Sequence, residues 1–231
     1  MPDKCPICGA DTSHLKEVKQ KGINTNGNVY TICYAAVMVV IVAFLLAFVS
    51  KALQQKSDAN VAIDKKSQIL AALCIRSLDK SMVEAKYAEV VKEEKDMDGD
   101  HPLYICEVDG QTKYVVPVKG MGLWGGLWGY IGINDDGCTV YGAYFSHESE
   151  TAGLGALIAE LPFQEQFKGK KIFDSNGNVV LSVIKVGKKI DGLDASSRCD
   201  ALTGATLTSD GVDQMLKSCL AKYKDILNNN Q

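Results

Sequence analysis

A short run of hydroxyl-bearing and small residues, 200–206 with the letters DALTGAT, lies just before the last predicted helix. The first turn of a helix leaves backbone N–H groups unpaired, and these groups, with the positive end of the helix dipole, bind anions. Gly204 and Ala205 are small enough for a phosphate to approach the backbone closely. The pattern therefore predicts a phosphate group beside Thr206, although a hydroxyl-rich loop of this kind also serves simply to cap a helix.

The helix that follows must hold these residues in place. Thr208 and Ser209 add further hydroxyls where a helix begins. From Val212 onward apolar residues recur at intervals of three and four, which is typical of a helix with one buried face. The apolar positions are Val212, Met215, Leu216, Cys219, Leu220, Tyr223, Ile226 and Leu227.

Two further segments carry residues suited to a ligand. The stretch 119–132, KGMGLWGGLWGYIG, has neither the lysine spacing of a phosphate loop nor a strand–GxGxxG–helix context. Its tryptophans indicate either a loop over a planar ligand or the packing of a bend. The stretch 147–155, HESETAGLG, offers glycines for a tight turn, the Thr151 hydroxyl, and Leu154, which can pack on a ring. An ordinary strand-to-helix turn would give the same letters.

A membrane anchor is predicted near the N-terminus. Residues 29–49 read VYTICYAAVMVVIVAFLLAFV, without a charge or a proline, and a helix of this length matches a hydrocarbon core of about 30 Å. A cleaved signal peptide is the alternative, but its apolar region is usually shorter, about 7 to 15 residues. Lysines lie on both sides of the span, so the positive-inside rule does not fix its orientation.

The rest of the chain predicts an α+β domain. We expect helices over 58–73 and about 79–94, a solvated acidic loop at 96–100, and short antiparallel strands. Turn signals at 109–110, 135–137 and 176–177 each separate two strand-like runs. The predicted organisation is an N-terminal extension (1–28), a transmembrane helix (29–53), a helical linker region (54–97) and a ligand-binding domain with a C-terminal helix (98–231).

Composition excludes some classes of function. The net charge is −3 and basic residues form no dense patch, so we expect no nucleic-acid partner. Cys5 and Cys8 form half of a zinc knuckle with His14 nearby, but a full site needs four ligands, and we expect no metal centre. Disulfides Cys199–Cys219 and Cys106–Cys138 both remain open from spacing alone.

The segment Thr203-Gly204-Ala205-Thr206, with Asp200 ahead of it, resembles the flavinylation motif of FMN-binding subunits of respiratory ion-pumping complexes. The greatest similarity is to the C subunits of the sodium-pumping NADH:quinone oxidoreductases, the Nqr family. The resemblance implies that Thr206 carries FMN through a phosphoester bond. It also implies that Asp200 and Thr203 are recognised by the flavin transferase that attaches the cofactor.

Two other segments extend the resemblance. Gly122-Leu123-Trp124 is similar to a Gly-Leu-Trp segment that lies near the isoalloxazine ring in these proteins, which implies a cofactor contact for Trp124. Residues 150–155 resemble the Glu-Thr-Pro-Gly-Leu-Gly motif that lines the flavin site. This sequence has Ala152 where proline is usual, which removes a preset dihedral angle. The implied flavin-binding residues here are Glu150, Thr151, Gly153, Leu154 and Gly155.

The implied activity is electron relay within a sodium-translocating NADH:quinone reductase, with no complete reaction on this chain alone. Other Nqr subunits, a flavin transferase and the lipid bilayer are the implied partners. The implied location is the bacterial inner membrane, with the flavin domain on the outer, periplasmic face. Three alternatives stay open: the G subunit of an Rnf-type ferredoxin:NAD oxidoreductase, a noncovalent flavodoxin-like carrier, and a cofactor-free anchored interaction subunit.

Overall fold

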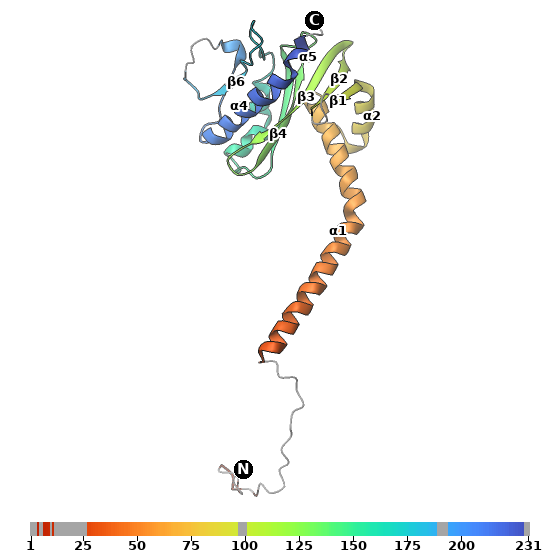
Figure 1. Cartoon of the computed structure of the whole chain (residues 1–231), viewed down its shortest axis with the longest axis vertical. Helices are drawn as coiled ribbons and strands as arrows, with labels where there is room; N and C mark the ends of the chain where they lie inside the picture. Colours follow the sequence, from red (N-terminus) through yellow and green to blue (C-terminus); the bar gives the residue numbers. More distant parts are fainter. Residues whose placement is uncertain are drawn as a thin grey trace. The chain divides into compact units, whose positions relative to one another are not determined.

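The computed structural model describes residues 4, 7–9, 11, 27–96, 101–188 and 194–228 (Figure 1). The chain divides into two compact units, Met1–Lys56 and Ser57–Gln231. The predicted half-knuckle falls largely outside the described residues, since Cys5 and His14 are not among them; Cys8 is exposed and Gly9 has a φ of +68°. The acidic loop lies outside them as well, except for Asp96.

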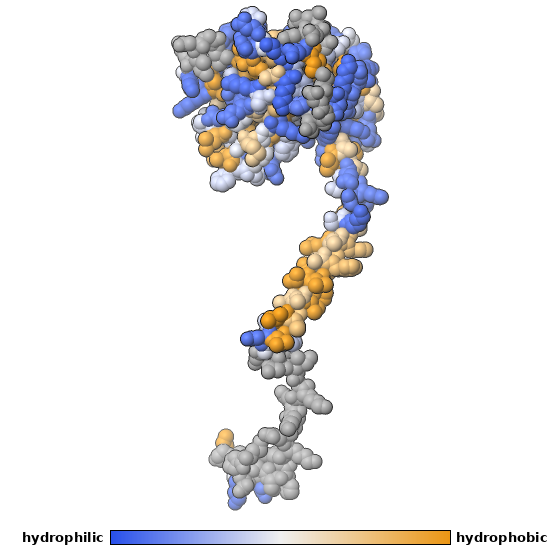
Figure 2. Space-filling view, viewed as in Figure 1, coloured by the Kyte–Doolittle hydropathy of each residue, from blue (hydrophilic) through white to orange (hydrophobic). Residues whose placement is uncertain are grey.

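One long helix, α1 (Asn28–Ala72), contains the predicted membrane span. It is long and apolar enough to cross a bilayer, and none of the side chains in its apolar window is buried within the protein (Figure 2). The unit boundary falls inside this helix, between Lys56 and Ser57. Its last residues, from Ile69 on, are buried in the second unit.

An antiparallel five-stranded sheet forms the frame of the second unit, with its strands in chain order. Hairpins at the predicted turn signals connect β2 to β3 through the two residues 109–110 and β4 to β5 through the longer loop 134–139. The edge strand β1 is exposed and charged at every position after its first, which protects a sheet edge from pairing with other chains. The strands are β1 (Val91–Asp96), β2 (Pro102–Val108), β3 (Gln111–Met121), β4 (Gly126–Ile133) and β5 (Val140–His147).

The sheet has an apolar cluster on each face because successive side chains of a strand point to opposite sides. One face, with Val116, Val118 and Ile131, packs against the C-terminal helices, and α4 lies across β3. The other face, with Val115 and Tyr130, packs against the end of α1 and against α2. The helices on the first face are η1 (Gly155–Ala159), α3 (Leu161–Glu165), α4 (Thr206–Leu220), η3 (Ala221–Tyr223) and α5 (Lys224–Asn228); α2 is Lys80–Val90.

The periodic C-terminal segment is confirmed as helical, and its apolar face is buried. Val212, Leu216 and Leu220 are fully buried, as are Tyr223 and Leu227 beyond the end of α4. Cys219 and Ile226 are only half buried at the margin of this face. Burial along the whole face fixes both the position and the rotation of α4, and so the position of Thr206 at its start.

Four expectations need correction. The helix expected over 58–73 is not separate, because α1 runs without a break from Asn28 to Ala72. The second helix ends at Val90, because residues 91–96 pair with β2 as strand β1 instead of continuing the helix to 94. The turn at 176–177 closes a single bridge between Phe173 and Val179, not a hairpin. The short strands were expected to be antiparallel, but β6 (Ser182–Ile184) pairs in parallel with β7 (Arg198–Asp200). A short helix, η2 (Ala195–Ser197), directly precedes β7.

The open question of disulfides is answered for four of the cysteines. Cys106 and Cys138 belong to clusters on opposite faces of the sheet, so they cannot approach one another. Cys199 and Cys219 are also free thiols. The Cys219 thiol instead accepts a hydrogen bond from the N–H of Lys119 and donates to its carbonyl, both at 3.4 Å.

Candidate functional site

Three segments singled out by sequence meet within the second unit. They are the loop between β3 and β4, the turn that follows β5, and the start of α4. Glu150 joins all three. Its Oε1 accepts the N–H of Trp124 at 2.8 Å, and its Oε2 accepts the hydroxyl of Thr208 at 2.6 Å. Only 7% of the Glu150 residue surface is exposed; its bond to Thr208 is buried, and its bond to Trp124 is partly buried.

The turn after β5 is held tightly around this carboxylate. The Thr151 carbonyl accepts backbone hydrogen bonds from the N–H groups of Leu154 and Ala156, both at 3.1 Å. Gly153 has a φ of +74°, which a side chain would make unfavourable. Ser149 donates its hydroxyl to the carbonyl of Trp124 at 2.9 Å, so the turn is bonded to the Trp124 loop twice.

Gly155 is required by close packing. A Cβ atom at this position would lie 2.5 Å from both Glu150 Oε2 and Thr208 Oγ1. We expect Gly155→Ala to lower the free energy of unfolding by about 2 kcal/mol, because it displaces a buried hydrogen bond. Gly126→Ala is the control, since its Cβ would make an ordinary contact at 3.5 Å. Thermal unfolding of both variants measures the difference, and equal melting temperatures would contradict this packing argument.

The Glu150 carboxyl stays ionised in spite of its location. Burial alone raises its pKa, but hydrogen bonds from Thr208 and from the backbone at Trp124 outweigh this effect, and the pKa lies below the ordinary value of 4.5. The folded chain therefore binds this proton less readily than the unfolded chain does. The stability that Glu150 contributes is present above about pH 4.5 and is lost as the pH falls through the lower, folded-state pKa.

This linkage predicts a measurable pH dependence. We expect the free energy of unfolding to fall as the pH drops below about 4.5, and to fall less steeply in Glu150→Gln, which cannot titrate there. Chemical denaturation of both proteins at a series of pH values between about 3 and 7 provides the comparison. Parallel curves would show that Glu150 does not contribute to the acid sensitivity.

The start of α4 leaves Thr206 exposed to solvent. Thr206 is the first residue of the helix and is exposed, whereas Thr208 and Ser209 are buried. The Ser209 hydroxyl accepts the N–H of Leu202 at 3.0 Å and donates to the carbonyl of Ala205 at 2.9 Å. The hydroxyls therefore do not cap the helix as expected. The residue before the helix is Ala205, whose side chain makes no capping hydrogen bond, and the Ser209 hydroxyl bonds to the backbone of the preceding loop.

The loop before Thr206 is shaped by Gly204. Its φ of +81° lies in the left-handed region that favours glycine, and a Cβ here would lie 3.1 Å from a methyl group of Leu154. Leu154, in the turn after β5, therefore lies close to Gly204 in the loop 203–205. Thr203, like Gly204, is exposed. Backbone N–H groups of the first helical turn thus lie beside an exposed hydroxyl, an arrangement that suits a phosphate.

Large apolar side chains surround this end of α4 and face solvent. Trp124 is 66% exposed, Leu207 60%, Leu123 48% and Leu154 43%. In Figure 1 one end of α4 is drawn lower than the other, and Figure 2 shows hydrophobic surface near that lower end. Exposed apolar groups next to a polar anion site are what a phosphate ester with an aromatic body would contact.

Asp200 is placed less directly. It ends β7, is exposed, and forms an ion pair with Arg198 at 3.1 Å; its N–H donates to Gln166 Oε1 at 2.8 Å.

The sequence did not identify Thr208 as the partner of Glu150, because residues 58 positions apart show no local signal of contact. Among the residues that the structure describes, no three metal-binding side chains gather into a cluster.

Residues 122–221, which include all three segments, match the family described as FMN-binding domain. The crystal structure of the C subunit of Na(+)-translocating NADH-quinone reductase from Parabacteroides distasonis is 38% identical to this chain. Its TM-score is 0.70, and the match covers 76% of this chain and 96% of that one.

The chain belongs to the family of Na(+)-translocating NADH-quinone reductase C subunits. The predicted fold class is confirmed: an apolar N-terminal helix is followed by an α+β domain with an antiparallel sheet and a C-terminal helix. The crystal structure of Shewanella oneidensis NqrC shares this fold at 21% identity, with a TM-score of 0.61, over 73% of this chain and 97% of that one.

Curated members of the same family align over a shorter region. The C subunit from Chlamydia pneumoniae is 39% identical over 127 residues, which is 50% of this chain and 40% of that protein. The C subunit from Haemophilus ducreyi is 40% identical over 133 residues, which is 58% of this chain and 46% of that protein. The matched region thus spans less than half the length of these relatives.

Proposed function

We propose that this chain is a membrane-anchored flavoprotein subunit that carries FMN covalently on Thr206 and relays electrons within a Na(+)-translocating NADH-quinone reductase. The observation that carries the proposal is the exposed Thr206 hydroxyl at a helix start without a side-chain cap, inside the FMN-binding domain region. The remaining subunits of that reductase are the proposed partners, and this chain completes no reaction alone. NADH oxidation and quinone reduction take place on other subunits.

The residues around Thr206 fit FMN. The helix N-terminus and Gly204 suit its phosphate, and the exposed Trp124 and Leu154 side chains offer apolar surface to its ring system. When bound, FMN supplies the electron chemistry, whereas the chain supplies position and electrostatics. Glu150 acts indirectly, because it bonds the Trp124 loop to the helix that bears Thr206. Thr151, Gly153 and Gly155 shape the turn between them.

Attachment needs an enzyme that this chain does not contain. We assign this step to a flavin transferase that uses FAD and magnesium. A bond forms between Thr206 Oγ1 and the riboflavin-side phosphorus of FAD, the pyrophosphate bond breaks, AMP leaves, and the hydroxyl proton is released. Asp200 and Thr203 are the proposed recognition residues for this enzyme, and both are exposed as recognition requires.

The membrane anchor is proposed from α1. Its apolar N-terminal part spans the bacterial inner membrane, and the flavin domain lies on the periplasmic face. A covalent bond would then retain the cofactor through every redox cycle in a compartment where released FMN would be lost. Reactivity of exposed cysteines toward an impermeant maleimide in whole cells tests this orientation; Cys74, which is exposed, should react from outside.

Intact mass tests the central proposal. The full chain is expressed with and without a flavin transferase, and only the coexpressed chain should gain the mass of FMN less one water. Acid precipitation should leave its yellow colour in the pellet, since noncovalent flavin would stay in the supernatant. Equal masses in the two samples would refute covalent attachment.

Trp124 provides a further prediction. We expect Trp124→Ala to keep covalent FMN but to shift its absorbance maximum and redox potential, because the exposed indole lies in the loop that Glu150 bonds to the helix bearing Thr206. Absorbance spectra and redox titration of the coexpressed protein measure both. A spectrum and a potential identical to the wild type would show that Trp124 does not touch the ring.

A further inference from the structure

A single buried amide, the side chain of Gln164 in α3, joins the chain segments that enter and leave the turn after β5. Its Nε2 donates to the carbonyl of Phe145, in β5 before the turn, at 3.1 Å. The same nitrogen lies 2.9 Å from the carbonyl of Ala159 and 3.4 Å from that of Ile158, both in η1 after the turn. Gln164 is 1% exposed, so its amide takes its partners from the protein. The amide thus closes the base of the loop 146–157, which contains the whole turn.

The Arg76 side chain determines which way round this amide lies. Its Nη1 donates to Gln164 Oε1 at 2.8 Å, and its Nη2 donates to the carbonyl of Ala143 on β5 at 2.8 Å. A guanidinium group has no acceptor, so it must face the oxygen of the amide and not the nitrogen. The Gln164 nitrogen is therefore left facing the three carbonyls, which need donors. All the contacts of the amide agree with this one orientation.

Arg76 belongs to the segment 73–79, which connects the end of α1 to the start of α2. Two residues of this segment, Cys74 and Ser77, have a φ of 61°, in the left-handed region that favours glycine. Such a conformation is unfavourable for residues with a side chain, so it persists only where the surroundings hold it. The Cys74 thiol donates to the carbonyl of Tyr141 at 3.6 Å. Cys74 and Arg76 together therefore hold this segment on β5.

Aromatic packing around Gln164 fixes α3 against β5. Phe163 and Phe167 pack edge to face on Phe145, with ring centroids 5.9 and 4.9 Å apart, and the two also contact each other at 5.5 Å. All three rings are buried. Close packing of this kind leaves little room for α3 to shift. The Gln164 amide is therefore held in place by its own helix as well as by Arg76.

We propose that Gln164 and Arg76 are positioning residues for the flavin. Gln164 closes the base of the turn that carries Glu150 and Leu154, and Arg76 keeps the Gln164 amide in the orientation that closes it. Neither residue lies in the turn, so both act through it. The inference rests on the proposed function, because it concerns FMN attached at Thr206. A loosened base would let the turn move against the ring system and would change the potential of the flavin.

Gln164→Met tests the role of the amide. The new side chain keeps a similar length but has no donor, so the three carbonyls lose their shared partner. We expect the N–H groups of Leu154 and Ala156, which bond to the Thr151 carbonyl inside the turn, to exchange about tenfold faster. Hydrogen exchange of the full chain in detergent, read by mass spectrometry, measures this rate. The midpoint potential of FMN in protein coexpressed with a flavin transferase should shift as well.

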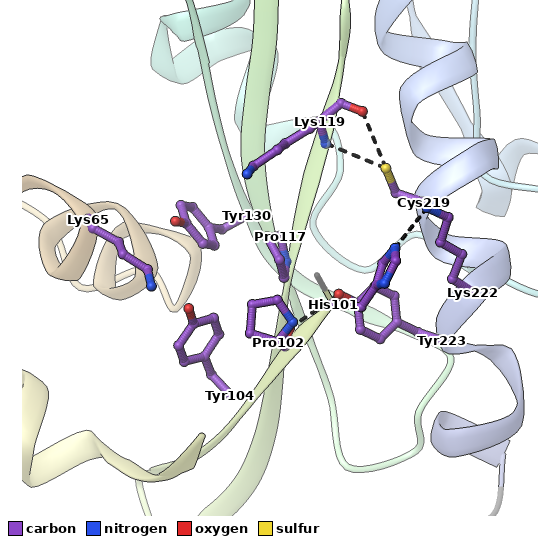
Figure 3. Close-up of a pocket in the computed structure, with 10 residues that line it drawn as sticks. All are labelled: Lys65, His101, Pro102, Tyr104, Pro117, Lys119, Tyr130, Cys219, Lys222 and Tyr223. Carbon is purple, nitrogen blue, oxygen red and sulfur yellow. Dashed lines mark hydrogen bonds between the residues drawn. The ribbon is translucent and has the colours of Figure 1, made fainter. Parts of the chain in front are cut away.

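Tyr223→Phe is the matched control. It removes another donor on a buried side chain, the Tyr223 hydroxyl, which bonds to the carbonyl of Pro102 at 3.2 Å (Figure 3). This bond joins η3 to β2, beyond the C-terminal end of α4, and involves no residue of the turn. An effect of lowered stability alone would appear in both variants. We therefore expect Tyr223→Phe to leave the exchange of the turn and the flavin potential unchanged.

Arg76→Met tests the second residue and is the milder change, because Arg76 is only half buried. It leaves the Gln164 amide free to turn over, so we expect the same two effects to a smaller extent. If Arg76 acts through Gln164, adding Arg76→Met to Gln164→Met should change neither the exchange nor the potential further. Additive effects in the double variant would overturn the positioning role of Arg76.

The outcomes separate this proposal from the proposed function. Wild-type exchange and potential in Gln164→Met would overturn the positioning role of Gln164. Faster exchange with an unaltered potential would overturn it too, since Gln164 would then only stabilise the fold. Intact mass is the separate readout: a chain without covalent flavin refutes the proposed function, whereas exchange in the unmodified chain still decides whether Gln164 and Arg76 hold the turn.

Discussion

Thr206→Val is expected to abolish covalent flavin while the domain still folds. The variant removes the only hydroxyl that the proposal allows to form the phosphoester, so no flavin should remain after denaturation. Because Thr206 is exposed, its replacement should change the free energy of unfolding by only about 0.5 kcal/mol. In-gel fluorescence after coexpression with a flavin transferase measures the attached flavin, and circular dichroism confirms folding.

Two controls make this result specific. Thr206→Ser restores a hydroxyl at the same position and should recover fluorescence, at least in part. Thr112→Val makes the same chemical change at an exposed threonine on β3 and should keep full fluorescence. A fluorescent band from Thr206→Val would exclude Thr206 as the attachment residue and direct attention to Thr203, the other exposed threonine of the loop.

Glu150→Ala is expected to cause the largest loss of stability among the site variants. It removes the acceptor of both the Trp124 N–H and the Thr208 hydroxyl. The Thr208 hydroxyl then stays buried, and the Trp124 N–H partly buried, without a partner, at about 1–3 kcal/mol each, so we expect a total loss of about 3 kcal/mol. For a domain of this size that corresponds to a fall of about 10 °C in melting temperature.

The neighbouring Glu148 offers a matched control. Its carboxylate also accepts a backbone hydrogen bond, from Gly126 at 3.2 Å, but its side chain is exposed. Glu148→Ala should therefore cost less than about 1 kcal/mol, because water replaces the lost bond. Thermal unfolding of both variants in the same detergent is the measurement. Equal losses would mean that burial of Glu150 does not matter.

Local signals predicted most of the elements that position the site. The three- and four-residue spacing from Val212 onward identified α4 and its buried face. The Asp109-Gly110 turn located the β2–β3 hairpin, with Asp109 and Gly110 both at positive φ. Hairpins and amphipathic helices are encoded by neighbouring residues, so a single sequence suffices to find them.

Pairings between segments far apart in the chain could not be predicted from the sequence in the same way. The segment 91–96, VKEEKD, has the composition of a surface helix, and only its register with β2 makes it a strand. The parallel pairing of β6 with β7 joins two three-residue strands whose pattern carries no period. The bond between Glu150 and Thr208 likewise depends on how distant segments fold together. The individual site residues could therefore be proposed from the sequence, but the contacts between them could not.

The absence of a side-chain cap at Ala205 has a consequence for how the subunit is made. Until an acceptor arrives, the first turn of α4 relies on water for its amide groups, and such turns fray. Esterified chains would gain an acceptor at that spot and resist proteases that attack frayed segments. On the proposed function, attachment of FMN would therefore stabilise the start of α4 as well as supply the cofactor.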